Sequence, residues 1–137
     1  AAGASDGLQL GDNSKAALVT RALAEMIRLG TAMHGQLATF YGLSGAGDLV
    51  LTCFSKHSRN RYVGEQLGRG LAINEITSSM RMVAEGIPTA KSAYECARKL
   101  NIDTPIIDQV YALLYEQKSA GDALRALLSR EQKAERW

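Results

Sequence analysis

Residues 14–33 have the sequence SKAALVTRALAEMIRLGTAM, in which apolar side chains recur every three or four positions. One series follows the spacing of a helix face and consists of Leu18, Ala22, Met26, Leu29 and Met33. A second series lies beside it and consists of Ala16, Val19, Leu23 and Ile27. Two apolar stripes predict a helix that is buried over much of its circumference, as a central helix would be. We expect this helix to end at Gly35.

The rest of the chain predicts further helices joined by short turns. Residues 3–11 are expected to form a loop, with Asp12 or Asn13 capping the central helix. After that helix we expect others at 38–41, from 48, from 59 to the glycines at 68 and 70, at 73–80, around 88–100, from 105 and from 119. No stretch alternates apolar and polar residues for long enough to form a strand. The sequence therefore predicts one all-α domain over residues 1–129 and a charged, frayed tail over residues 130–137.

The composition is that of an ordinary globular domain. Apolar residues make up 46% of the 137 residues, enough for a core, and the formal net charge of +2 gives no support for general nucleic-acid binding. No run of 18 apolar residues is present, so we expect no membrane span. Cys53 and Cys96 form no CxxC pair and are expected to be buried free thiols in a reducing cytoplasm. Because His34 and His57 have no partner at metal-ligand spacing, no metal site is predicted.

A candidate site lies in two short blocks, GAGDLVLTC at 45–53 and SRNR at 58–61. Asp48 and Thr52 are four residues apart, so they share one face of the predicted helix. Ser58 can cap the following helix, whose free N–H groups attract an anion. The planar Arg59 guanidinium can bind a phosphate at two positions at once. A carboxylate and a hydroxyl facing a cationic helix start are suited to a small polyol phosphate.

Each of these residues also has an ordinary structural interpretation. Asp48 can simply stabilise the dipole in the first turn of its helix, and Thr52 can hydrogen-bond back to its own helix. Residues 56–61 can form a capped surface helix with a solvated run of charges. The residues alone leave both interpretations open.

The two blocks belong to a wider pattern. GLSGAGDLVLTC at 42–53 and the SRNR that follows closely resemble the substrate-domain motif of the bacterial NAD(P)-dependent glycerol-3-phosphate dehydrogenase family. Residues 3–29 resemble the preceding segment of that family, and VAEGIPTA at 83–90 resembles the following one. The resemblance covers about residues 1–129 and implies a helical domain like the C-terminal domain of 6-phosphogluconate-dehydrogenase-like enzymes. It also implies interconversion of dihydroxyacetone phosphate and sn-glycerol 3-phosphate with NAD or NADP.

The resemblance further implies roles for individual residues. Asp48 corresponds to a carboxylate that helps hold the substrate and orients the catalytic lysine, and Thr52 corresponds to a residue of the same pocket. The residues implied to hold the substrate phosphate are Ser58, Arg59 and Asn60. The residues implied to approach the cofactor are Arg59, Val83 and Glu85. Without the resemblance, Glu85 is a helix-start carboxylate with no ligand.

Other parts of the active site are expected outside this chain. In the resembled family the catalytic lysine lies a few residues before the segment that matches the AAG at 1–3, and a second substrate-binding lysine lies in a preceding Rossmann domain. Lys15, Lys56 and Lys91 match neither, and no GxGxxG loop follows a strand-like run. The apolar start of the chain also resembles the inside of a fold. We therefore expect a fragment with half of an active site, inactive by itself.

Two alternatives stay open. The chain can be a non-catalytic helical assembly or dimerisation module, because a two-striped helix would also serve subunit packing. The helical domains of 6-phosphogluconate and 3-hydroxyacyl dehydrogenases are a weaker alternative, since their motifs do not match. For the complete protein we expect a homodimer that binds a small phosphorylated substrate.

Overall fold

The computed structural model describes residues 1–131, and in that part of the chain all regular structure is helical. The segments are α1 (Ala2–Gly7), α2 (Gly11–Ala32), α3 (Leu37–Tyr41), the π-helical η1 (Leu43–Gly47), α4 (Asp48–Phe54), α5 (Arg59–Gly68), α6 (Ile73–Ser79), α7 (Gly86–Lys99), α8 (Pro105–Tyr115) and α9 (Ala120–Leu128). The predicted all-α fold is confirmed. Within these residues no helix is both long and apolar enough to cross a membrane. Most of the tail predicted at 130–137 lies outside the described residues.

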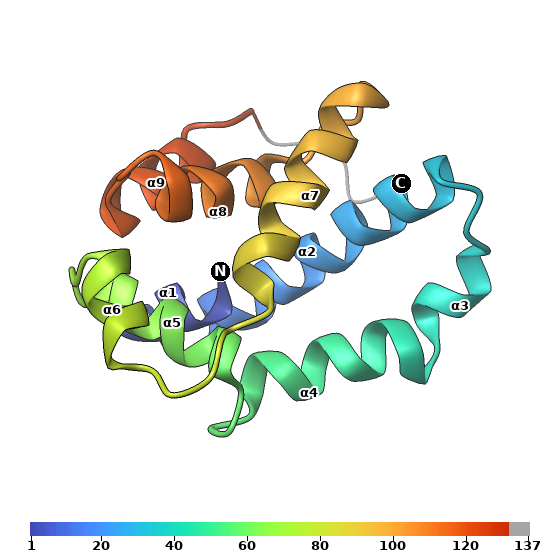
Figure 1. Ribbon diagram of the computed structural model, residues 1–137. Helices are drawn as coiled ribbons and strands as arrows, with labels where there is room; N and C mark the ends of the chain where they lie inside the picture. Colours follow the sequence, from blue (N-terminus) through green and yellow to red (C-terminus); the bar gives the residue numbers. More distant parts are fainter. Residues whose placement is uncertain (132–137) are drawn as a thin grey trace.

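The long helix α2 runs through the middle of the molecule, with α4 below it and α8 and α9 above it in the view of Figure 1. Its contacts are with α1, α3, α4 and α8. Each predicted apolar stripe contributes one buried residue, Val19 and Leu29. Met33 is exposed, because it follows the last turn of α2. The central position of this helix is therefore predicted correctly, but its buried face is only partly so.

The loop predicted at 3–11 is wrong, because most of this segment is helix α1. Its glycines allow the backbones of α1 and α5 to touch. A Cβ on Gly3 would lie 1.9 Å from the carbonyl oxygen of Arg61, and one on Gly7 would lie 2.2 Å from that of Glu65. Glycine lowers the helix propensity of an isolated segment, but here it removes the atom that would separate two helices. The local sequence contains no sign of this distant partner.

The start of α2 also differs from the prediction. The helix begins at Gly11, directly after Leu10, and neither Asp12 nor Asn13 caps it with a side-chain hydrogen bond. Gln9 and Gly11 have φ values of 57° and 82°. These two left-handed residues reverse the chain between α1 and α2.

At its other end α2 stops three residues before the predicted Gly35. His34 has a φ of 67°, and its N–H donates to the Thr31 carbonyl oxygen at 3.0 Å. The Gly35 N–H donates to the Gly30 carbonyl oxygen at 2.8 Å. This is the Schellman arrangement, with His34 in the left-handed position that glycine usually occupies. His34 therefore lies at the C-terminal end of α2.

An ion network joins α1, α2 and α5. The Asp6 carboxylate lies 2.9 Å from Lys15 Nζ and 2.8 Å from Arg61 Nε, and Arg61 also pairs with Glu65 at 3.4 Å. The Lys15 side chain is almost fully buried, and its Nζ lies 4.6 Å from the centre of the Phe54 ring on α4. Because buried charges are tolerated only when paired, this network fixes the relative positions of four helices.

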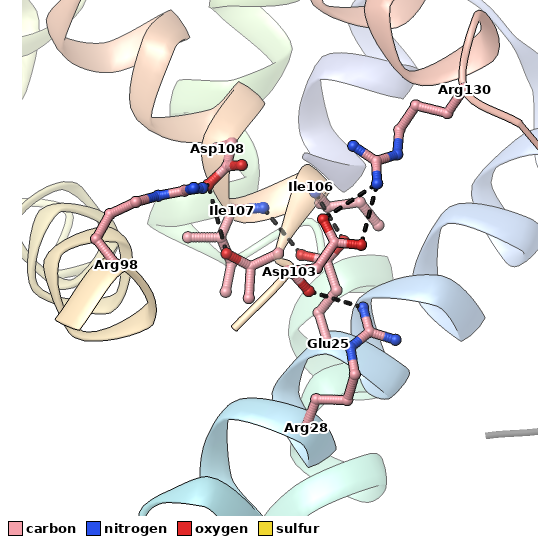
Figure 2. Close-up of polar contacts among 9 residues, drawn as sticks. Glu25, Arg28, Arg98, Asp103, Ile106, Ile107, Asp108 and Arg130 are labelled. Carbon is pink, nitrogen blue, oxygen red and sulfur yellow. Dashed lines mark hydrogen bonds and ion pairs between the residues drawn. The ribbon is translucent and has the colours of Figure 1, made fainter. Parts of the chain in front are cut away.

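A second polar contact joins α2 to α8, as Figure 2 shows. The Glu25 carboxylate, which is 2% exposed, accepts hydrogen bonds from the backbone N–H groups of Ile106 at 2.7 Å and Ile107 at 3.1 Å. These N–H groups belong to the first turn of α8 and have no partner within that helix. Burial raises the pKa of Glu25 to about 7, although the two backbone hydrogen bonds oppose that rise.

The two cysteines are free, as predicted, but each is only partly buried. Cys96 Sγ lies 3.5 Å from Met33 Sδ, which places α7 against the end of α2. Desolvation raises the pKa of the Cys53 thiol. Cys53 is therefore a packing group and a poor nucleophile.

Candidate functional site

The start of α5 has the geometry of a capped helix. Ser58 precedes it in an extended conformation, and its Oγ accepts a hydrogen bond from the Arg61 N–H at 3.1 Å. The predicted cap is therefore confirmed. The N–H groups of Arg59 and Asn60 lie in the same first turn and have no acceptor within the helix. They are the groups that an anion at this helix start would use.

A short turn brings the end of α4 next to this helix start. Ser55 Oγ accepts a hydrogen bond from the His57 N–H at 3.2 Å, and the Ser55 carbonyl oxygen accepts one from the Ser58 N–H at 3.3 Å. These two bonds close the connection between the helices. Thr52, in the last turns of α4, consequently borders the same space as the first turn of α5.

The start of α7 is joined to the start of α5 by a side chain. Asn60 Oδ1 accepts a hydrogen bond from the Gly86 N–H at 2.9 Å. Glu85 directly precedes Gly86 and is the residue after which α7 begins. Figure 1 shows the segment between α6 and α7 passing close to the start of α5 before it rises into α7.

These three segments border an open cavity of about 330 Å³. Five of the predicted site residues line it: Thr52, Ser58, Arg59, Asn60 and Glu85. Three lining residues are absent from the predicted site: Leu51, Ser55 and His57. The structure thus brings together residues from three parts of the sequence.

The sequence positions of the three unpredicted lining residues indicate that they belong to the site. Leu51 directly precedes Thr52, and the turn residues Ser55 and His57 lie between Thr52 and Ser58. A connection this short between two helices that share a site must itself border that site. His57 has no partner at metal-ligand spacing, so its own residue type gave no indication of this position.

The remaining two predicted residues do not line this cavity. Asp48 is the exposed first residue of α4, directly after η1, and lies one helical turn before Thr52. Val83 is 72% exposed in the segment that leads to α7. Both side chains therefore face outward near the cavity, where a second ligand or another part of a longer protein could reach them.

Two arginines of α5 differ in their partners. Arg61 is held by Asp6 and Glu65. Among residues 1–131, Arg59 has no carboxylate partner, and it borders the cavity. A guanidinium beside a helix start favours an oxyanion, while the Glu85 carboxylate gives another part of the wall an acceptor for hydroxyl groups. The cavity is thus suited to a small ligand with an anionic end and hydroxyl groups.

The described residues that line the cavity supply hydroxyl, amide, imidazole, guanidinium and carboxylate groups. Within the described part of the chain, no cluster of three or more His, Cys, Asp or Glu side chains could hold a metal ion. The described residues that line the cavity include no lysine. The polar groups that the described part of the chain brings to the cavity are the side chains of Arg59, Glu85, Asn60 and His57, the hydroxyl groups and the backbone N–H groups.

Known proteins share this sequence and fold. A family model described as NAD-dependent glycerol-3-phosphate dehydrogenase C-terminus matches residues 1–125. The NAD(P)+ glycerol-3-phosphate dehydrogenase of Citrifermentans bemidjiense is 57% identical over 135 residues, which are 98% of this chain and 40% of that protein. The corresponding protein of Geobacter sulfurreducens is 55% identical over 137 residues, 100% of this chain and 41% of that protein.

A solved structure agrees with these sequence relatives. The crystal structure of glycerol-3-phosphate dehydrogenase from Coxiella burnetii superimposes with a TM-score of 0.91 at 41% identity, over 94% of this chain and 40% of that one. The chain spans about 40% of the length of the relatives it matches. Because the family model covers nearly all of it, the chain belongs to the NAD-dependent glycerol-3-phosphate dehydrogenase C-terminus family.

Proposed function

We propose that this chain is the substrate-binding part of an oxidoreductase that interconverts dihydroxyacetone phosphate and sn-glycerol 3-phosphate with NAD or NADP. The observation that carries the proposal is the cavity at the start of α5, where Arg59 has no carboxylate partner among residues 1–131. The relatives are named NAD(P)+ glycerol-3-phosphate dehydrogenases, which supports the same substrate. We include residues 1–129 in this domain and place the protein in the cytoplasm.

The phosphate is assigned to the first turn of α5. There the helix dipole and the free N–H groups attract a dianion, and Arg59 can donate two parallel hydrogen bonds to its oxygens. Ser58 Oγ already accepts from Arg61, so its hydroxyl hydrogen remains available as a donor. Asn60 adds its amide N–H groups. Together these donors account for recognition of a phosphate ester.

The polyol end of the substrate is assigned to Thr52 and Asp48. Thr52 borders the cavity, and Asp48 lies one turn away on the same helix face. A carboxylate at Asp48 would keep a nearby lysine ammonium charged and oriented, so that the lysine can give a proton to the substrate carbonyl oxygen. We assign that lysine to a part of the complete protein outside this chain.

The cofactor is assigned to the side of the cavity formed by Glu85, with Val83 and Arg59 as further contacts. NADH or NADPH supplies the hydride when it is bound. The exposed Val83 side chain and the cavity-facing Glu85 both fit a group that approaches from outside this chain. No GxGxxG loop is present in the 137 residues, so we assign the main cofactor-binding site to a part of the complete protein outside this chain.

The direct test is a chimera. The chain replaces the matching region of the Geobacter sulfurreducens relative, and oxidation of NADH and NADPH is followed with dihydroxyacetone phosphate. We expect turnover with this substrate and much less with dihydroxyacetone, which lacks the phosphate. A folded chimera without turnover would contradict the proposal. Turnover by the 137-residue chain alone would contradict the division of the active site, since we expect that chain to be inactive.

An assembly module is the second candidate. It is favoured by exposed apolar side chains along α3, η1 and α4, namely Leu37, Tyr41, Leu43, Val50, Leu51 and Phe54. An apolar surface of this kind suits contact with another subunit, and we propose a homodimer for the complete protein. Sedimentation of the active chimera separates the two roles: a dimer with turnover supports both, whereas a dimer without turnover leaves only assembly.

A further inference from the structure

The hydrogen bond between Asn60 and Gly86 joins two segments to which the proposed function gives different ligands. Asn60 lies in the first turn of α5, which is assigned to the phosphate. Gly86 follows Glu85, which is assigned to the cofactor. The two residues are 26 positions apart in the sequence, yet Asn60 Oδ1 and Gly86 N are 2.9 Å apart.

This contact fixes which end of the Asn60 carboxamide faces the cavity. A backbone N–H can only donate, so the atom that meets Gly86 must be the carboxamide oxygen. The amide NH₂ group is then left for the cavity that Asn60 lines. An amide nitrogen only donates, and an anion only accepts. The Gly86 contact therefore orients Asn60 for anion binding before any ligand arrives.

The space at Gly86 makes the same contact sterically demanding. A Cβ on this residue would lie 2.8 Å from both Cγ and Oδ1 of Asn60. At this distance the carboxamide has to shift, so a side chain at position 86 would displace it from the N–H group. Glycine at this position therefore allows the close approach of Asn60.

We propose that Asn60 is a positioning residue that couples the anion cavity to the Val83–Glu85 segment through Gly86. An anion that engages the NH₂ group of Asn60 holds its oxygen on Gly86, and Gly86 in turn holds Glu85 at the cavity edge. Either ligand thus favours the arrangement that the other requires. This coupling rests on the proposed function, because only that function assigns two ligands to the two segments.

The test is a double-mutant cycle in the chimera, with Asn60→Ala, Gly86→Ala and the double variant. Two constants are measured: the dissociation constant of inorganic phosphate by calorimetry and the KM for NADH. We expect the phosphate constant to rise about tenfold in Asn60→Ala and about fivefold in Gly86→Ala, although Gly86 offers no side chain to the ligand. The double variant should resemble Asn60→Ala, since the smaller side chain leaves nothing for the new Cβ to displace.

Two further variants separate coupling from general damage. Gly121 is the second residue of α9, and a Cβ there would lie 3.8 Å from an Arg125 guanidinium nitrogen, an ordinary van der Waals contact. Gly121→Ala should therefore leave both constants unchanged. Asn60→Asp keeps the oxygen that Gly86 needs but replaces the donor with a charge. It should weaken phosphate binding and leave the KM for NADH nearly unchanged.

The outcomes separate the coupling between the two segments from the anion site itself. If the effects of Asn60→Ala and Gly86→Ala multiply in the double variant, the coupling is wrong while the anion site stands. The coupling is also wrong if Gly86→Ala lowers only the thermal midpoint and leaves both constants unchanged. If the unaltered chimera does not bind phosphate, the proposed function fails and the coupling fails with it. If Gly86→Ala alone misfolds, the double variant can still be compared with Asn60→Ala, because the double variant removes the steric conflict.

Discussion

The two sides of α5 use similar residues for opposite purposes. On the side facing α1, Arg61 is locked between Asp6 and Glu65, and glycines bring the two backbones into contact. On the side facing the cavity, Arg59 lies two residues earlier and has no carboxylate partner within residues 1–131. One side is closed by internal contacts, and the other is left open for a ligand.

This difference shows how a binding surface is recognised beside a structural one. Polar groups inside a fold are normally satisfied by partners in the same fold. When a cationic side chain and free helix N–H groups lack such partners and border a cavity, an external anion is the natural partner. The closed side should therefore respond to mutation through stability, and the open side through ligand binding.

The largest expected effect breaks the closed side. Gly3→Ala places a Cβ 1.9 Å from the Arg61 carbonyl oxygen, so α1 and α5 must separate. We expect a loss of about 3 kcal/mol or more in the free energy of unfolding, or a fall of roughly 10 °C in the thermal midpoint. Urea denaturation measures the loss. Gly121→Ala, where the space is open, is the control; an equal loss in both variants would contradict tight packing at Gly3.

The second prediction tests Asp48 near the open side. Asp48→Asn keeps the size of the side chain but removes the charge that we assign to orienting a lysine. In the chimera we expect turnover to fall roughly a hundredfold, with a smaller change in KM for dihydroxyacetone phosphate. The thermal midpoint is measured on the same preparation. Unchanged turnover with a midpoint several degrees lower would make Asp48 a partner of the helix dipole only.

The third prediction compares the two arginines directly. Arg59→Lys keeps a charge but loses the planar pair of donors, so we expect the KM for dihydroxyacetone phosphate to rise about tenfold. Arg61→Lys is the matched control on the closed side. It should lower stability by weakening the contact with Asp6 and leave the KM unchanged. An unchanged KM in Arg59→Lys would return Arg59 to the solvated surface helix that the sequence alone allows.

Local sequence predicts the helix boundaries that depend on local groups. Ser58 caps α5 as predicted, and α8 and α9 begin at Pro105 and directly after Ser119, close to the expected starts at 105 and 119. The same reasoning fails for α1, because its glycines are useful only against the distant α5. It also fails for the hydrogen bonds of Glu25, whose partners lie 81 and 82 residues away.

The residues of the candidate site also fall into those that local sequence predicts and those that it does not. The physics of a capped helix start singles out Ser58 and Arg59 from the sequence, and both line the cavity. The place of Glu85 beside them came only from the family resemblance, since no local pattern links it to α5. Ser55 and His57 lie in the short connection between Thr52 and Ser58, so the sequence indicates them only if the two helices are assumed to share one site.

The smallest expected effect extends the comparison to a buried carboxylate that has internal partners. Burial raises the pKa of Glu25 from 4.5 in the unfolded chain to about 7. Between these pH values the folded state binds more protons than the unfolded state, so the stability that Glu25 contributes is greatest below pH 4.5 and is lost as the pH rises through 7. Glu25→Gln keeps one acceptor for Ile106 and cannot titrate. The free energy of unfolding of both proteins is measured by urea denaturation across this pH range. As the pH rises, the unaltered chain should lose on the order of 1 kcal/mol of stability relative to Glu25→Gln. The loss is smaller than the full desolvation effect because relaxation and water entry reduce that effect. If the unaltered chain instead gains stability relative to Glu25→Gln as the pH rises, the hydrogen bonds from Ile106 and Ile107 outweigh burial and Glu25 is held ionised.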